Sequence, residues 1–167
     1  MRRRGVDVVV SSTPPSGVDA VVAEEDSYLV LSADPEVREP EGARLRAFHE
    51  AYSAEPAEPG TVVVQGGSAL RLLAVVHDLS QDPSWREEWI AAALQAVLRE
   101  ADSRRVRILA MPPLGRVHGS LPSERFVSLL RSALHMGAPR HLERIWVVAP
   151  EEDAGELRSL LESRLWR

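Results

Sequence analysis

The sequence of 167 residues contains no cysteine, no lysine and no asparagine. Without cysteine, the chain can form no disulfide, no thiolate nucleophile and no cysteine-ligated metal site. Without lysine, it can form no Schiff base and has no Walker-type lysine for binding phosphate. All 20 cationic side chains are therefore arginine. These absences exclude several classes of enzyme.

Long apolar runs and a strong positive charge are also missing. No segment approaches the roughly 18 uninterrupted apolar residues of a membrane span, and the run after Arg2–Arg4 is too short for a secretory signal. The net charge of −5 gives no reason to expect general affinity for nucleic acid, and Arg2–Arg4 is typical of a solvated tail. We expect a cytoplasmic protein with no membrane or nucleic-acid partner. The length and the 44% apolar content fit one domain spanning residues 1–167.

Short valine-rich runs alternate with helical patterns along the chain. The runs are nearly continuous in hydrophobicity, which is typical of strands covered on both faces. The predicted strands are Val6–Val10, Ala20–Ala23 with an extension through Tyr28–Leu31, Thr61–Gln65, Leu72–His77, Val106–Ala110 and Ile145–Val148.

Apolar stripes with a period of 3.6 residues predict helices over Ser84–Ala101, Ser123–His135 and Glu151–Leu165, and a weaker one around Gly42–Tyr52. Asp82 or Ser84 can cap the first of these, and Pro83 suits its first turn. The alternation of strands and helices predicts an α/β fold with a mixed, mostly parallel central sheet of about six strands between helices.

One loop stands at the position where such folds bind ligands. Met111–Pro122, "MPPLGRVHGSLP", leaves the carboxyl end of a predicted strand and enters a predicted helix. Gly115 and Gly119 allow close approach of the backbone to an anion, and Arg116 adds a planar cation. We call residues 111–122 the second loop and expect any bound anion to lie within it. The alternative is that Arg116 folds back onto Asp34 or Glu36 and fills the cleft.

The order of these landmarks resembles that of a macro domain, the ADP-ribose-binding fold. Val18–Val22 is similar to the family's D-A-I-V strand, Gly60–Asp78 to its pair of strands ending in V-I-H, and Ile108–Pro122 to its A-F-P…T-G-x-x-G-x-P loop. The resemblance implies a three-layer α/β/α fold. It also implies ligand contacts at Ser12, Ala23, Asp26, Asp34, Gly115, Arg116, Val117, His118, Gly119 and Ser120.

The sequence departs from the family where the ligand is held. The family's N-A-A-N segment falls on Ala23–Asp26, "AEED", and no shift of the alignment restores it because the chain has no asparagine. The family's glycine-rich turn falls on Ser32–Glu36, where Pro35 has no N–H to offer a phosphate. One carboxylate about 4 Å from a phosphate charge costs on the order of 4 kcal/mol at an effective dielectric of 20. Carboxylates at Glu24, Glu25, Asp26, Asp34 and Glu36 therefore predict weak diphosphate binding.

No metal site or cofactor is predicted, and no catalytic residue is assigned. The histidines show no metal-ligand spacing, and His77, which matches V-I-H, is expected to be buried and structural. His118 and Ser120 lack a third group to orient the histidine. The predicted function is a divergent macro module that recognises ADP-ribose or a related nucleotide weakly, or a non-catalytic module with a protein partner. The alternative is a hydrolase of ADP-ribosyl or phosphate ester bonds, centred on His118 and the second loop.

Overall fold

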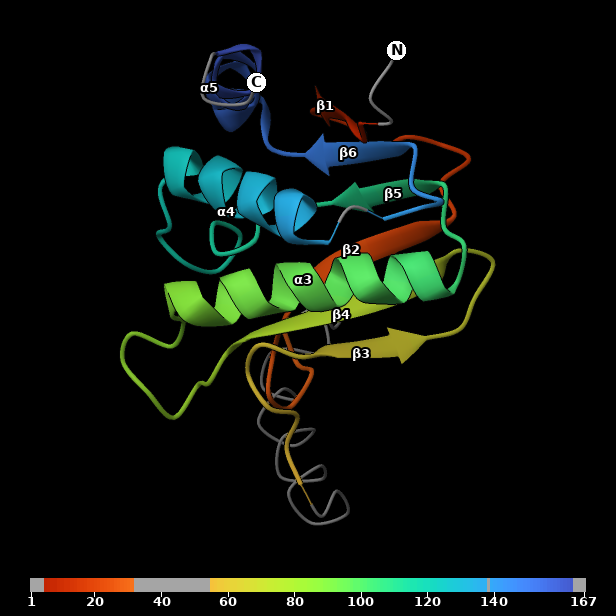
Figure 1. Cartoon of the computed structure of the whole chain (residues 1–167). Coiled ribbons are helices and arrows are strands. Elements are labelled where there is room, and N and C mark those ends of the chain that lie inside the picture. The colour runs from red at the N-terminus through yellow and green to blue at the C-terminus, as the bar shows by residue number, and fades with distance from the viewer. Residues whose placement is uncertain (1–4, 32–54, 138, 164–167) are drawn as a thin grey trace.

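The structure is a computed structural model that describes residues 5–31, 55–137 and 139–163. Its centre is a six-stranded mixed sheet (Figure 1). In spatial order the strands are β1 (Asp7–Ser11), β6 (Arg144–Val148), β5 (Ile108–Met111), β2 (Ala20–Asp26), β4 (Leu70–His77) and β3 (Val62–Gln65). All neighbours are parallel except the antiparallel pair β3 and β4. The predicted α/β fold class is confirmed.

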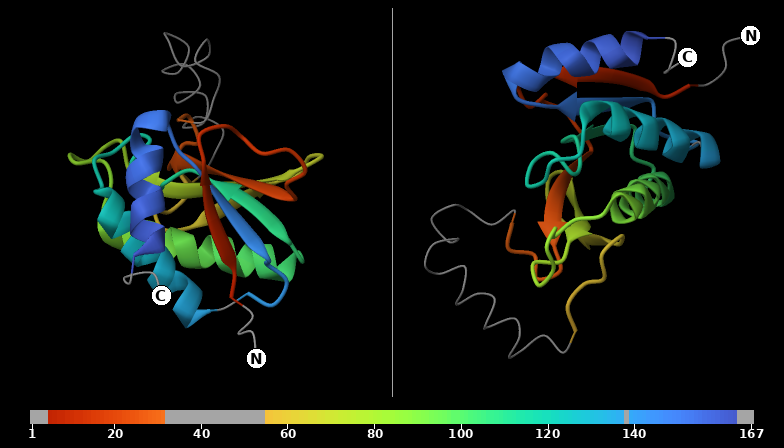
Figure 2. Two further views of the ribbon diagram at one scale, coloured as in Figure 1. Left: turned by 90° about the horizontal axis from the view of Figure 1, so that it is seen from above. Right: turned by 90° about the vertical axis from the view of Figure 1, so that its left-hand side faces the viewer.

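Three described helices pack on the sheet. They are α3 (Glu87–Ser103), α4 (Ser123–Met136) and α5 (Glu151–Glu162). Helices α3 and α4 lie side by side, and α5 continues the row toward β1 (Figures 1 and 2). Acidic residues occupy the first turn of each helix, where they complement the positive end of the helix dipole.

The main hydrophobic core lies between this row of helices and one face of the sheet. Alternate residues of β2, β5 and β6 point into it, and α3 and α4 contribute their predicted apolar stripes. The largest fully buried side chains are Phe126, Leu72, Leu73, Ile90, Leu94, Leu109, Met111, Leu114, Leu121, Leu130, Ile145 and Leu157. Most of the stability of a domain of this size comes from such burial, at about 25 cal/mol per Å² of apolar surface.

Two local predictions are wrong. The helix predicted from Ser84 begins at Glu87, and its N-cap residue, Arg86, makes no side-chain capping hydrogen bond. Pro83 lies in the loop before the helix, and the Asp82–Pro83 peptide bond is cis. The predicted extension of the second strand through Tyr28–Leu31 is a turn, because the carboxylate of Asp26 accepts hydrogen bonds from the amides of that segment. The helix expected around Gly42–Tyr52 lies outside the described residues.

The strands β2 and β5 separate soon after they pair. Their register covers only Ala20 with Leu109 and Val21 with Ala110, whereas β2 continues beside β4 as far as Asp26. The chain leaving β5 becomes the second loop and lies beside the carboxyl-terminal half of β2. Open α/β sheets bind ligands at such a divergence of strands.

None of the helices in the described parts of the chain is both long and apolar enough to span a bilayer.

Candidate functional site

The second loop closes on itself through main-chain hydrogen bonds. The Arg116 amide donates to the Pro113 carbonyl at 3.1 Å, and the Leu121 amide donates to the Gly115 carbonyl at 3.1 Å. Gly115 has a φ of +86°, a conformation that favours glycine. Gly119 is required by close approach, because a Cβ there would lie 2.6 Å from the Gly115 carbonyl oxygen and 2.8 Å from the Trp85 ring. Both glycines therefore shape the loop as the sequence predicted.

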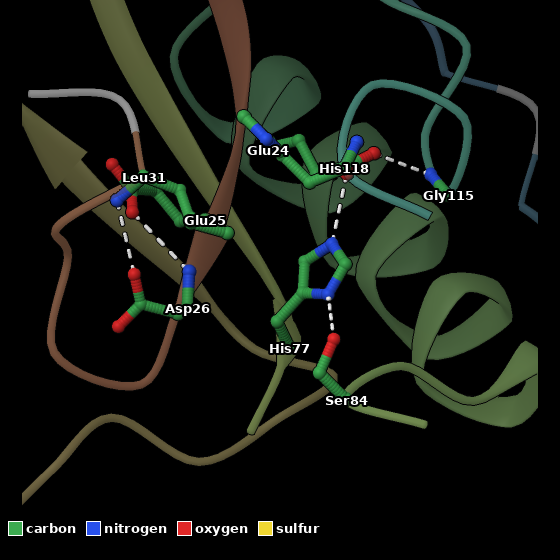
Figure 3. A network of polar contacts seen from close by, with 8 residues as sticks. All are labelled: Glu24, Glu25, Asp26, Leu31, His77, Ser84, Gly115 and His118. Atoms are coloured by element: carbon green, nitrogen blue, oxygen red, sulfur yellow. Dashed lines mark hydrogen bonds and ion pairs between the residues drawn. The ribbon is translucent and has the colours of Figure 1, made fainter. Parts of the chain in front are cut away.

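Two amides of the second loop converge on the side chain of Glu24 (Figure 3). The Gly115 amide donates to Oε1 of Glu24, and the His118 amide donates to Oε2 at 2.8 Å. Glu24 projects from the carboxyl-terminal half of β2 and is only 3% exposed. Converging backbone N–H groups form a concave site that favours an anion. The anion held here is a carboxylate of the chain itself.

The third partner of Glu24 is His77, at the end of β4. Its Nε2 lies 2.8 Å from Oε2 of Glu24, and its Nδ1 lies 2.8 Å from Oγ of Ser84. His77 is 0% exposed, and its ring meets the ring of His118 edge to face at 6.2 Å between centroids. The sequence predicted a buried, hydrogen-bonded role for His77, and that prediction is confirmed.

The two acidic residues after Glu24 are also fully buried. Asp26 accepts the Tyr28 amide at 2.7 Å through Oδ1, and the Val30 and Leu31 amides at 3.0 Å through Oδ2. Glu25 accepts the Asp26 amide at 3.2 Å. A buried carboxylate is tolerated only when hydrogen bonds satisfy its oxygens. Asp26 uses its oxygens to hold the turn that ends β2.

Arg116 forms its ion pair with a residue of helix α5. Its guanidinium donates to Oδ1 of Asp153, in the first turn of α5, at 3.0 Å and to the Leu121 carbonyl at 2.9 Å. Both side chains of this ion pair are about a quarter exposed. The sequence left two alternatives, a free Arg116 and an Arg116 paired with Asp34 or Glu36. Among the described residues the pairing is with Asp153, and Asp34 and Glu36 lie outside them.

The other predicted ligand positions are spread along the carboxyl edge of the sheet. Ser12 is exposed just after β1, and Ala23 is half-buried within β2. Val117 is 50% exposed, and Ser120 is exposed at the end of the second loop. Their roles in binding remain predictions. Asp34 falls outside the residues that the structure describes.

The sequence placed Glu24 near a bound diphosphate but expected only repulsion. The structure shows that its carboxylate accepts hydrogen bonds from the amides of Gly115 and His118. Sequence reasoning also missed the contact of Ser84 with His77. Glu24 and Gly115 are 91 positions apart, so nothing local in the sequence signals their contact. Within residues 5–31, 55–137 and 139–163, no group of three or more His, Asp or Glu side chains could hold a metal ion.

Structural comparison identifies the architecture. The Oceanobacillus iheyensis macrodomain with ADP superimposes with a TM-score of 0.66 at 15% identity, covering 93% of this chain and 88% of that one. A mutant of the same macrodomain with ADPR gives a TM-score of 0.67 at 16% identity over 96% and 93% of the two chains. The macrodomain of Thermus aquaticus DarG gives 0.64 at 19% identity over 87% and 100%. No protein-family model and no curated protein matches the sequence. The chain has the macrodomain fold, as its sequence landmarks predicted.

Proposed function

We propose that this chain is a divergent macrodomain-like module of the cytoplasm. It recognises ADP-ribose or a related nucleotide or anion weakly, or serves as a non-catalytic interaction module. Solved macrodomains with ADP and with ADPR support the ligand class. We infer a weak affinity because the second-loop amides already donate their hydrogen bonds to Glu24.

A diphosphate that used these amides would have to displace Glu24. The carboxylate would lose hydrogen bonds from two amides and from His77, and it is almost fully buried. Hydrogen bonds to charged groups contribute roughly 1.5–3 kcal/mol each. A net cost of about 3 kcal/mol lowers an affinity roughly 100-fold. The ion pair with Asp153 also leaves Arg116 less available to offset the charge of a phosphate.

Isothermal titration calorimetry with ADP-ribose tests this proposal. For the unaltered protein we expect a Kd of tens of micromolar or weaker on these grounds. The corresponding binding free energy is about −6 kcal/mol or less negative than that. NAD, AMP and inorganic phosphate in the same buffer would show which part of the ligand is recognised. Submicromolar binding of ADP-ribose by the unaltered protein would contradict the proposal.

A further inference from the structure

The hydrogen bonds around His77 fix the direction in which a proton can move. A carboxylate can only accept hydrogen bonds, so the Nε2 that faces Glu24 carries the hydrogen. When the imidazole is neutral, Nδ1 has a free lone pair that can accept the proton of the Ser84 hydroxyl, which lies 2.8 Å away. The order is hydroxyl, imidazole base and orienting carboxylate (Figure 3). This is the arrangement by which a histidine activates a serine nucleophile.

The burial of the three groups follows the same order. His77 is 0% exposed and Glu24 is 3% exposed, whereas Ser84 is partly exposed. A base shielded from water and a hydroxyl within reach of solvent are what an attacking serine requires.

The loop that carries Ser84 holds it in place. The Asp78 amide donates to the Ser84 carbonyl at 2.6 Å, and His77 forms a β-bridge with Trp85. Within this loop the hydroxyl and the amide of Ser80 both donate to Asp78, and these bonds hold the pKa of that carboxyl below its usual value. Asp78 also accepts a hydrogen bond from the side-chain amide of Gln81 at 2.9 Å. The main-chain contacts of the loop fix the backbone of Ser84 beside His77.

We propose that Ser84 is a nucleophile that accepts acyl groups from small, activated carboxylic esters. Its Oγ forms a bond with the carbonyl carbon while its proton passes to Nδ1 of His77. The ester C–O bond then breaks, and the leaving alkoxide takes the proton from Nδ1. Water repeats the sequence in reverse, which releases the carboxylic acid and restores Ser84. Glu24 acts as a positioning residue, because it sets the tautomer of His77. This activity goes beyond the proposed binding function and does not depend on it, and it would exclude the non-catalytic alternative.

Diisopropyl fluorophosphate tests the proposal without a known substrate. Attack by Ser84 forms an O–P bond and expels fluoride, and the hydroxyl proton passes to His77. Peptide mass spectrometry of the unaltered protein should locate the adduct at Ser84, with exposed serines such as Ser128 in the same digest as internal controls. Absence of an adduct at Ser84 under conditions that label a known serine hydrolase would overturn the proposal. So would equal labelling of Ser84 and Ser128.

Variants separate activation from mere exposure of the hydroxyl. Ser84→Ala should abolish the adduct, because it removes the attacking hydroxyl. His77→Gln should slow labelling about 100-fold or more, the usual contribution of a general base. Glu24→Gln can donate an amide hydrogen to Nε2 and so favour the wrong tautomer, and we expect a loss of at least tenfold. Circular dichroism would confirm that each variant is folded. A folded His77→Gln variant labelled at the rate of the unaltered protein would refute activation by His77.

Discussion

Replacing Glu24 with alanine should lower the free energy of unfolding by about 2–4 kcal/mol, because the change leaves buried donors without an acceptor. These donors are the amides of Gly115 and His118 and the Nε2 of His77. His77 is completely buried, so solvent does not replace the acceptor that its Nε2 loses. Urea denaturation followed by circular dichroism measures the change.

A matched variant separates this effect from a simple change in net charge. Glu100→Ala removes the same charge from an ion pair with Arg104 in which both side chains are more than a third exposed. Such pairs contribute about 0.3–0.5 kcal/mol. A loss of stability below about 1 kcal/mol for Glu24→Ala would show that the second loop does not depend on the carboxylate.

Gly115→Ala should also destabilise the protein strongly, by about 2–4 kcal/mol. The φ of +86° at this position is strained for a residue with a side chain. A Cβ would lie 2.5 Å from Cδ1 of Ile90 and 3.0 Å from Cβ of Leu121. Either the buried Ile90 side chain or the loop backbone must shift, and a backbone shift would move the amide that binds Glu24. Chemical denaturation gives the free energy, and two-dimensional NMR would report movement of the second-loop amides.

Gly66→Ala is the control for this substitution. Gly66 lies outside the left-handed region, and a Cβ there would meet nothing within 4 Å. Alanine at such a position leaves stability unchanged or raises it by roughly 0.4–1 kcal/mol, through the unfolded state. If both glycine variants were equally stable, the close packing of Gly115 against Ile90 would be ruled out.

The elements of the fold could be predicted because local patterns determine them. Valine-rich runs gave the strands to within two residues at most ends, and the stripe of Phe126, Leu130 and Ala133 gave α4 from Ser123. The start of α3 could not be predicted, because the hydroxyl of Ser84 is engaged by His77 rather than by the first turn of the helix. A serine before a helix pattern can predict a cap, but the sequence does not show that a residue outside the helix binds its hydroxyl instead.

The shape of the second loop could be predicted from the sequence, but the partner of its amides could not. Gly115 and Gly119 gave the shape of the second loop, which depends on residues that are close in sequence. The acceptor of the loop amides comes from β2. The separation of β2 from β5 places Glu24 beside these amides. Electrostatic reasoning from charge alone predicted repulsion of a ligand. It could not show that the same carboxylate accepts the hydrogen bonds of the loop amides.

We infer that Glu24 is a built-in substitute for an anion at the second loop. The most direct test of this inference is thermal unfolding of the unaltered protein and of the Glu24→Ala variant in inorganic phosphate, with sodium chloride at matched ionic strength as the reference. The account predicts saturable stabilisation by phosphate in the variant alone, approaching about 2.7 kcal/mol at 100 times the Kd. Phosphate would then restore most of the stability lost with the carboxylate. Equal responses of the two proteins to phosphate would contradict the account.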